Sequence, residues 1–183
     1  MQPADLHERL VSLGFRTPAD GGALLHALAC VNEPPAGAAD LQVTRVESFE
    51  DHLTAVELMW EAFSTPPDRR EAQRPHLRAE FEAAAAAEVP VTFLARLDGK
   101  PAGLGRSIYS DRGVFLIAGA VAEWARGRGV YRALVRARWD DAVARGTPAL
   151  VTEAMPDTSY PILKHVGFVD VCTIRRLEDP ARP

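Results

Sequence analysis

The sequence predicts an α/β (α+β) protein with a mixed, mostly antiparallel central sheet flanked by helices. Residues 91–121 read as a three-strand meander with a hairpin turn at Asp98-Gly99. A strand and two helices precede the meander at residues 41–87, and a helix, strand, helix and strand follow it over residues 130–177. Meander strands run antiparallel, whereas a strand reached through a crossover helix runs parallel, so the sheet must be mixed.

Composition excludes several classes of protein. The chain has 183 residues, 47% of them hydrophobic and 25% charged, which suits one globular domain with a small appendage. A formal net charge of −4 argues against non-specific binding of nucleic acid. No apolar run approaches the ~20 residues that span a bilayer, and no signal peptide is evident. We therefore expect a cytoplasmic protein without a membrane partner. The cysteines and histidines match no metal-binding spacing, so no metal is expected.

Residues 1–40 are predicted to form an N-terminal extension and linker, and residues 41–183 the main domain. The extension holds a short helix near residues 5–13, an apolar strand or helix at 23–30, and a Pro/Gly/Ala linker at 32–39. The segment Leu10–Phe15 repeats the pattern Leu-x-x-apolar-Gly-Phe of Leu163–Phe168. Chance explains so short a match, and so does a fragment of a second copy of the same fold.

Residues 41–87 are predicted to form a strand and then helices. Residues 41–46 alternate like a strand with one buried face, and Ser48 is the predicted N-cap of the next helix. Leu53, Val56, Trp60 and Phe63 recur at helical spacing, which favours a role for Trp60 in the core. Pro75 must start or break the helix that follows. The two helices could shape a substrate cleft.

A strand at residues 113–121 leads to Arg126-Gly127-Arg128-Gly129, and a helix begins directly after. The first turn of a helix has free backbone N–H groups at the positive end of its dipole. Glycines let a ligand approach that backbone, and arginines bind phosphate oxygens. The loop therefore indicates an anion site, for phosphate or pyrophosphate. An ordinary helix entry with solvated arginines is the alternative. The loop is neither a Walker loop nor a dinucleotide fingerprint.

The C-terminal part is predicted to hold two helices and two strands. Five residues share one apolar face of the first helix, which Gly146 ends: Tyr131, Leu134, Val135, Trp139 and Ala142. A buried strand at 149–152 should run parallel to the strand before it. A short helix at 157–166, capped by Gly167, leads to a last strand at 168–177.

Over residues 41–177 the chain resembles the GCN5-related N-acetyltransferase (GNAT) superfamily. The matching residues are Val121 five before Arg126, then Arg126–Val130, then Gly167-Phe168. The resemblance implies the acyl-CoA N-acyltransferase fold, acetyl-CoA as cosubstrate, and acetyl transfer to an amine. It implies that the loop and helix start hold the pyrophosphate, through Arg126, Gly127, Arg128, Gly129, Val130 and the backbone of Tyr131. It also implies that the strand ending at Val121 splays from the strand ending near Glu153, so that main-chain groups of Val121 contact the pantetheine arm. Ser159 contacts the coenzyme or caps its own helix.

Two positions depart from the family pattern. Tyr131 stands where the loop usually closes with Gly or Ala, and Leu163 stands where many members carry a tyrosine that protonates the departing thiolate. Tyr160 is the candidate acid, with His165 nearby. A thiol with a pKa near ~8.5 leaves adequately even without an acid.

The acceptor side needs a base, because an ammonium of pKa near ~10 must lose a proton before its nitrogen attacks. Glu123 and Glu153 are the candidates, one from each strand end, and surface carboxylates are the alternative interpretation. We expect the acceptor to be a primary amine of a small molecule or peptide.

Two other functions stay open from the sequence. Leu163 and the N-terminal fragment fit a non-catalytic acyl-CoA-binding or regulatory domain of the same fold. A phosphate-binding protein unrelated to acyl transfer explains the loop but not the meander. An N-terminal fragment that pairs with a neighbour's sheet would favour a homodimer.

Overall fold

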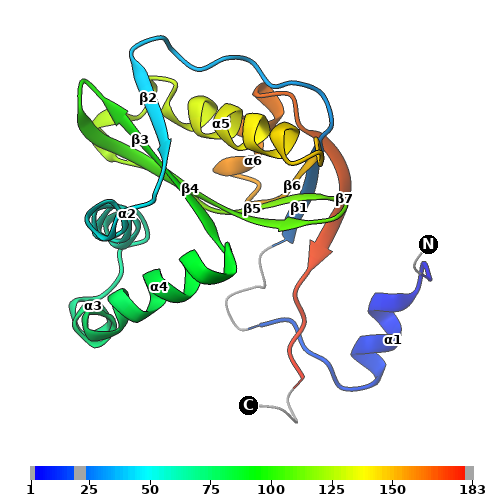
Figure 1. Ribbon diagram of the computed structural model, residues 1–183. Coiled ribbons are helices and arrows are strands. Elements are labelled where there is room, and N and C mark those ends of the chain that lie inside the picture. The colour runs from blue at the N-terminus through cyan, green and yellow to red at the C-terminus, as the bar shows by residue number, and fades with distance from the viewer. Residues whose placement is uncertain (1–2, 19–23, 180–183) are drawn as a thin grey trace.

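The computed structural model describes residues 3–18 and 24–179 and is built on one seven-stranded sheet (Figure 1). The strand order is β2-β3-β4-β5-β6-β1-β7, and only the β5–β6 pair is parallel. The mixed, mostly antiparallel sheet is therefore confirmed. The strands are β1 (Leu24–Cys30), β2 (Leu41–Arg45), β3 (Val91–Leu97), β4 (Lys100–Ser110), β5 (Gly113–Val121), β6 (Leu150–Ala154) and β7 (Val169–Arg175).

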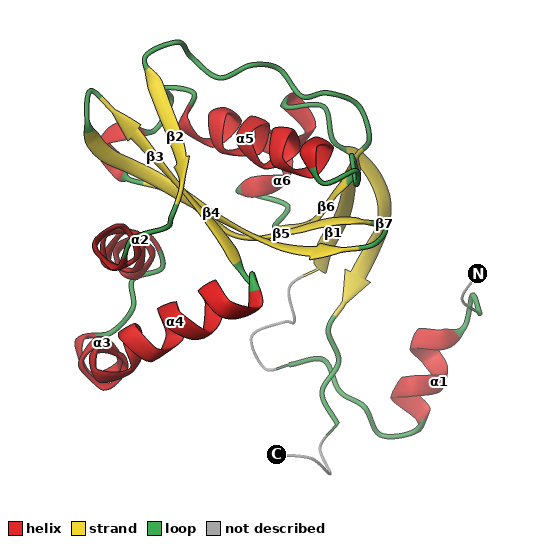
Figure 2. Ribbon diagram, in the orientation of Figure 1, coloured by secondary structure: helices red, strands yellow, loops and turns green. Residues whose placement is uncertain are grey.

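Helices cover both faces of the sheet (Figure 2). Helices α5 and α6 lie on one face, and α2 and α4 lie on the other. The helices are α1 (Leu6–Ser12), α2 (Phe49–Ala62), α3 (Pro67–Gln73), α4 (Leu77–Ala87), α5 (Val130–Ala144) and α6 (Ser159–His165), with 3-10 turns at Arg74–His76 and Glu123–Ala125. Among the described residues no helix is long and apolar enough to cross a bilayer.

Helix α5 anchors the main core through the predicted apolar face. Leu134, Val135 and Ala142 are fully buried, and Trp139 is 6% exposed. Gly146 follows the helix with a φ of 77°, which a residue with a side chain rarely adopts, and its N–H donates to the Val143 carbonyl. This packing fixes the start of α5 against the sheet.

Helices α2, α3 and α4 form the opposite layer. The Ser48 hydroxyl accepts a hydrogen bond from the Asp51 N–H at 3.1 Å, as predicted for an N-cap. Trp60 is 2% exposed, and its Nε1 donates to Oε1 of Gln73 at 2.7 Å, so it joins α2 to α3. Pro75 lies in a 3-10 turn and separates α3 from α4.

Strand β1 comes before the linker and yet lies inside the sheet, between β6 and β7. Ala27 pairs with Glu153 on one side and with Cys172 on the other. The apolar segment that the sequence left as a strand or a helix is therefore a strand. The predicted N-terminal segment also includes residues 1–2 and 19–23, which lie outside the described part of the chain.

Helix α1 lies to one side of the sheet (Figure 1), and Nε2 of its His7 is 3.0 Å from a guanidinium nitrogen of Arg175 in β7. It has no buried residue. The segment after it touches the far end of the chain, where Arg16 and Glu178 exchange backbone hydrogen bonds of 3.0 and 2.8 Å.

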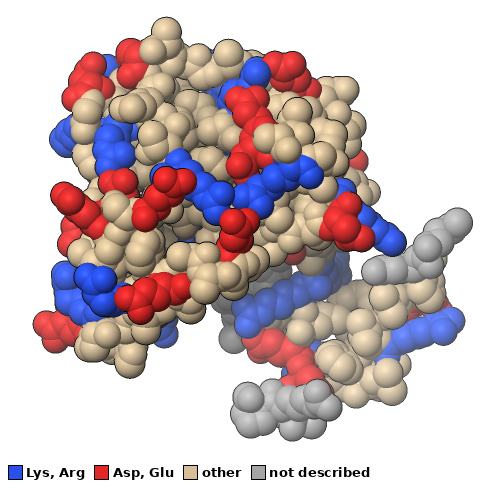
Figure 3. All heavy atoms as spheres, in the orientation of Figure 1, with Lys and Arg blue, Asp and Glu red and all other residues tan. Residues whose placement is uncertain are grey.

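Charges of both signs intermix on the face shown in Figure 3. Several arginines of the described chain are paired with carboxylates, as Arg145 is with Glu88 at 3.0 Å and with Asp141 at 2.9 Å. Such pairing leaves less free positive charge for a polyanion.

Candidate active site

The loop 126–129 between β5 and α5, called the glycine cradle below, has the geometry of an anion-binding site. Gly127 and Gly129 have φ values of 75° and 79°, so both positions favour glycine. No atom lies within 4 Å of the place where a Cβ of Gly127 would stand. Gly129 is the N-cap of α5, and no side chain caps this helix end. The backbone N–H groups of the first turn are therefore open to a ligand.

Three arginines surround this helix start. Arg126 and Arg128 are exposed beside the glycines. Arg132, which sequence reasoning missed, has a buried Nε without a hydrogen-bond partner in the described part of the chain. One of its guanidinium nitrogens lies 3.6 Å from the Cβ position of Gly129. The Arg-rich composition of the loop was a signal for it, because Arg132 is only three residues further on.

Strands β5 and β6 separate as the resemblance implied. They pair only at three positions, from Val114–Leu150 to Leu116–Thr152, although β5 continues to Val121. Beyond Leu116, main-chain groups of β5 have no ladder partner in β6. Ala118 adopts a φ of 45°, and the β4–β5 register shifts there, so β5 carries a bulge at the opening. The splay leaves unpaired strand edges that could bind an extended arm.

Tyr131 does not cover the loop with its side chain. Its ring lies against Gly119 of β5, where a Cβ would come within 2.9 Å of a ring carbon. Burial raises the pKa of the Tyr131 hydroxyl, and the nearby Arg138 opposes that shift. Val130 is 1% exposed in the core. Both residues therefore present their backbone, not their side chains, to the loop.

The two candidate bases lie at the ends of the splayed strands. Glu123 is exposed in the 3-10 turn directly after β5, and Glu153 is exposed on β6. No contact joins either carboxylate to another side chain in the part of the chain that the structure describes. Each carboxylate is therefore accessible from solvent.

The residues proposed on α6 are held by contacts within the chain. The Ser159 hydroxyl accepts a hydrogen bond from the Met155 N–H at 3.0 Å, which ties α6 to the end of β6. The Tyr160 hydroxyl donates to Oδ2 of Asp170 at 3.3 Å, and this bond raises the Tyr160 pKa. Leu163 is fully buried in the core, so that position offers no acid.

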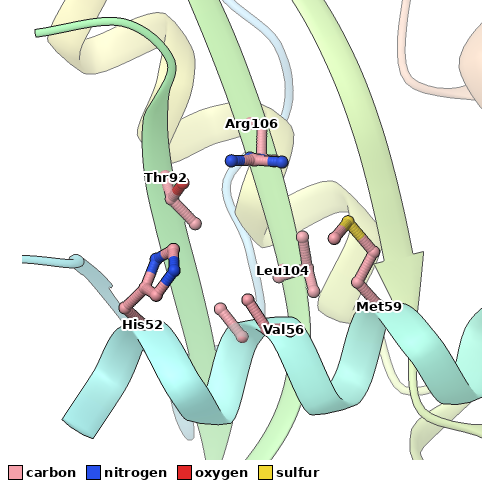
Figure 4. Close-up of a pocket in the computed structure, with 7 residues that line it drawn as sticks. His52, Val56, Met59, Thr92, Leu104 and Arg106 are labelled. Atoms are coloured by element: carbon pink, nitrogen blue, oxygen red, sulfur yellow. The ribbon is translucent and has the colours of Figure 1, made fainter. Parts of the chain in front are cut away.

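A polar cavity on the α2–α4 face was not anticipated from the sequence. Its shared walls are His52 of α2, Thr92 of β3 and Arg106 of β4, which point into one space (Figure 4). His52 is 6% exposed, and its Nε2 has no hydrogen-bond partner among the described residues. A histidine on the buried face of α2, four residues before Val56, was the available signal.

The acetyltransferase (GNAT) family model matches residues 53–168, more than half of the chain. The chain therefore belongs to the GNAT acetyltransferase family. This confirms the resemblance and supports the predicted class of enzyme, an acetyltransferase. No curated protein matches the sequence.

Solved structures share the fold at low sequence identity. A GCN5-related N-acetyltransferase from Kribbella flavida matches with a TM-score of 0.70 and 17% identity, over 97% of this chain and 64% of its own. A tandem GNAT protein from the clavulanic acid biosynthesis pathway matches with a TM-score of 0.73 and 14% identity, over 100% of this chain and 60% of its own. This chain thus spans less than two thirds of either structure.

In a third match, nearly the whole of the other protein is covered. A predicted acetyltransferase from Clostridium acetobutylicum, solved with acetyl-CoA, matches with a TM-score of 0.59 and 14% identity. The match covers 75% of this chain and 96% of that protein.

Proposed function

We propose that the protein is an acetyl-CoA-dependent N-acetyltransferase that acetylates a primary amine of a small molecule or peptide. The observation that carries the proposal is the open glycine cradle at the start of α5 beside the splayed ends of β5 and β6. Membership of the family supports the choice of cosubstrate, and so does the similar Clostridium protein that was solved with acetyl-CoA. The coenzyme would supply an acetyl thioester.

Each part of the proposed site would have its own role in the reaction. Backbone N–H groups of the first α5 turn, with Arg126 and Arg128, would bind the pyrophosphate. Main-chain groups of β5 up to Val121 would hold the pantetheine arm. Glu123 or Glu153 would take a proton from the acceptor ammonium, and the freed nitrogen would attack the thioester carbonyl. A C–N bond forms, the nitrogen loses its second proton to solvent, the C–S bond breaks, and the thiolate gains a proton from Tyr160 or water.

The first test measures binding and turnover together. Acetyl-CoA should raise the melting temperature of the protein, because it binds the folded state only. Free thiol should then appear in the presence of an accepted amine. Stabilisation without thiol release over a broad amine panel would favour the second candidate, a non-catalytic acyl-CoA-binding domain, which the buried Leu163 supports. Absence of stabilisation would contradict both functions.

The role of the base is tested by replacing each carboxylate. Glu123→Gln should lower kcat about a hundredfold, since general bases contribute about 10²–10⁴ in rate, and should leave acetyl-CoA affinity unchanged. Glu153→Gln is the parallel variant. Glu71→Gln on the exposed surface of α3 serves as the control. Unchanged kcat in both active-site variants would remove these carboxylates from the mechanism.

We also propose that residues 1–40 carry a fragment of a second copy of the fold. The repeated segments end their helices alike: Phe15 N–H bonds Leu10 O, and Phe168 N–H bonds Leu163 O, both at 3.1 Å. Gly14 and Gly167 have φ values of 97° and 104°. In α6 the corresponding segment packs on the sheet, whereas no residue of α1 is buried. The boundary at residue 40 and a cytoplasmic location stay predictions.

The exposed α1 supports a homodimer in which it packs on the edge strand β7 of a second copy. Leu13 is 75% exposed, and Val169 and Val171 of β7 are 55% and 63% exposed. Leu13→Glu with Val171→Glu should convert the dimer to a monomer in sedimentation velocity runs, because both charges would be buried in the interface. Val143→Glu, at a valine 50% exposed on α5, is the control. A wild-type monomer throughout the micromolar range would contradict the proposal.

A further inference from the structure

The cavity on the α2–α4 face consists of two spaces with apolar residues in their walls, and three polar residues lie between them. On one flank, a space of about 10 Å³ is walled by Ala55, Val56, Met59 and Leu104. On the other, a space of about 40 Å³ is walled by Phe81, Ala84, Ala85 and Val91 and by the charged Arg45 and Glu88. His52, Thr92 and Arg106 line both spaces, so the two adjoin each other. Figure 4 shows the three side chains directed toward one another.

His52 is a buried polar group with an unused ring nitrogen. It is 6% exposed, and its Nε2 has no hydrogen-bond partner in the part of the chain that the structure describes. Most buried polar atoms in native proteins have a hydrogen-bond partner, because leaving one without a partner destabilises the fold. Burial, then the charge of Arg106, lower the His52 pKa, whereas Glu80 opposes the shift. The ring is therefore neutral near pH 7 and carries one N–H.

Arg106 is a guanidinium without a carboxylate in contact. Among the described residues it forms no hydrogen bond or ion pair, although it is only partly exposed and lines the same spaces as residues of α2 and α4. Burial lowers its pKa, and the exposed Glu80, which acts on it only through its charge, opposes the shift. The other charged residues that line the cavity, Arg45 and Glu88, pair with each other at 3.7 Å, and Glu88 also pairs with Arg145. Arg106 thus has donors to spare for an anion.

The cavity lies one strand away from the opening between β5 and β6. Arg106 pairs with Ile117 of β5, the residue directly after the last β5–β6 pair and directly before the bulge at Ala118. The glycine cradle belongs to α5 on the other face of the sheet. A coenzyme held by α5 and a second substrate held by this cavity would therefore meet at the same opening from opposite faces.

We infer that the amine acceptor carries a carboxylate, and that Arg106 binds this carboxylate with help from His52 and Thr92. The guanidinium offers two parallel N–H donors to the two carboxylate oxygens, and the His52 N–H and the Thr92 hydroxyl are further donors. The acceptor class is accordingly that of amino acids and peptides ending in a free carboxylate. This inference rests on the proposed acetyl transfer for its meaning, but its binding step needs no catalysis.

The test compares matched acceptors that differ only in the carboxylate. Each proteinogenic amino acid is paired with the amine formed by its decarboxylation. Both compounds are assayed by thiol release from acetyl-CoA and, without acetyl-CoA, by thermal shift. We expect at least one amino acid to bind and react about tenfold or more better than its decarboxylated partner. Arg106→Gln should raise KM for that amino acid about tenfold to a hundredfold, as expected for about 1.5–3 kcal/mol in hydrogen bonds to a charged group. KM for acetyl-CoA and for the decarboxylated amine should not change.

Three further variants test whether the effect is specific to Arg106. Arg112→Gln, at an exposed arginine in the β4–β5 turn, should leave all constants unchanged. His52→Gln should weaken amino acid binding less than Arg106→Gln does, since it removes a neutral donor. Arg106→Lys keeps the charge and should restore part of the affinity if the glutamine variant folds poorly.

Two outcomes overturn the inference. One is that no amino acid is preferred over its decarboxylated amine by the wild-type protein. The other is that a preference persists unchanged in Arg106→Gln. Failure of acetyl-CoA to bind would instead contradict the proposed function, and the thermal-shift arm would still decide whether Arg106 binds a carboxylate.

Discussion

Gly129→Glu should abolish acetyl-CoA binding at concentrations that saturate the wild-type protein, which corresponds to a loss of about a hundredfold or more in affinity. The new carboxylate would stand where the pyrophosphate is proposed to bind, and like charges brought together at an interface cost several kcal/mol, ~3 or more. The space around the new Cβ is sufficient, since the nearest atom is 3.6 Å away. The fold should therefore survive. Isothermal titration with acetyl-CoA measures the loss.

The chain offers a close control for this variant. Gly99 in the β3–β4 hairpin turn has a φ of 76°, against 79° for Gly129, and nothing lies within 4 Å of its Cβ position. Gly99→Glu therefore imposes the same backbone strain and the same charge away from the cradle. It should lower the melting temperature as Gly129→Glu does and leave acetyl-CoA affinity intact. Equal affinity in all three proteins would show that the pyrophosphate does not bind at the start of α5.

Trp60→Ala should lower the free energy of unfolding by about 3–5 kcal/mol, the usual cost of emptying a buried aromatic site. Trp60 packs with Val56 and Leu77, and its Nε1 bond to Gln73 joins α2 to α3. Small domains have about 5–15 kcal/mol of stability in total, so this one change removes a large share. Urea denaturation followed by circular dichroism measures it.

Trp124→Ala is the matched control, because Trp124 is 40% exposed and contacts Lys100 through its ring face. Its loss should cost less than about 1 kcal/mol. Trp60→Phe should fall between the two, since it keeps the ring and removes the hydrogen bond. A cost below that of Trp124→Ala would mean that α2 and α3 are not held together through Trp60.

Much of the fold could be predicted because its signals are local. The Asp98-Gly99 turn, the Ser48 cap and the apolar face of α5 depend on residues close in sequence, and all three stand as predicted. Phe63 shows the limit of periodicity: it continues the apolar spacing of α2, but the helix ends at Ala62 and leaves Phe63 57% exposed.

The candidate site was predictable only where a loop builds it. The glycine cradle and the splay follow from a short motif and the order of the elements. His52 and Arg106 gave no comparable signal, because an isolated histidine and an isolated arginine are common and their meaning depends on what lies opposite. Only the packing of α2 on β3 and β4 leaves these two side chains facing one cavity.

By itself, the sequence determined the meander, the crossover helix and the glycine-bearing turn that starts it, since each depends on hydrophobic periodicity or on a backbone angle that glycine favours. Tertiary structure alone decided that β1 enters the sheet between β6 and β7, because that choice depends on which strand edges lie unpaired in space. It also decided that the Tyr131 ring lies against Gly119 and leaves the cradle open. Gly119 has no Cβ and so makes room for this ring, but the sequence does not show which side chain packs there.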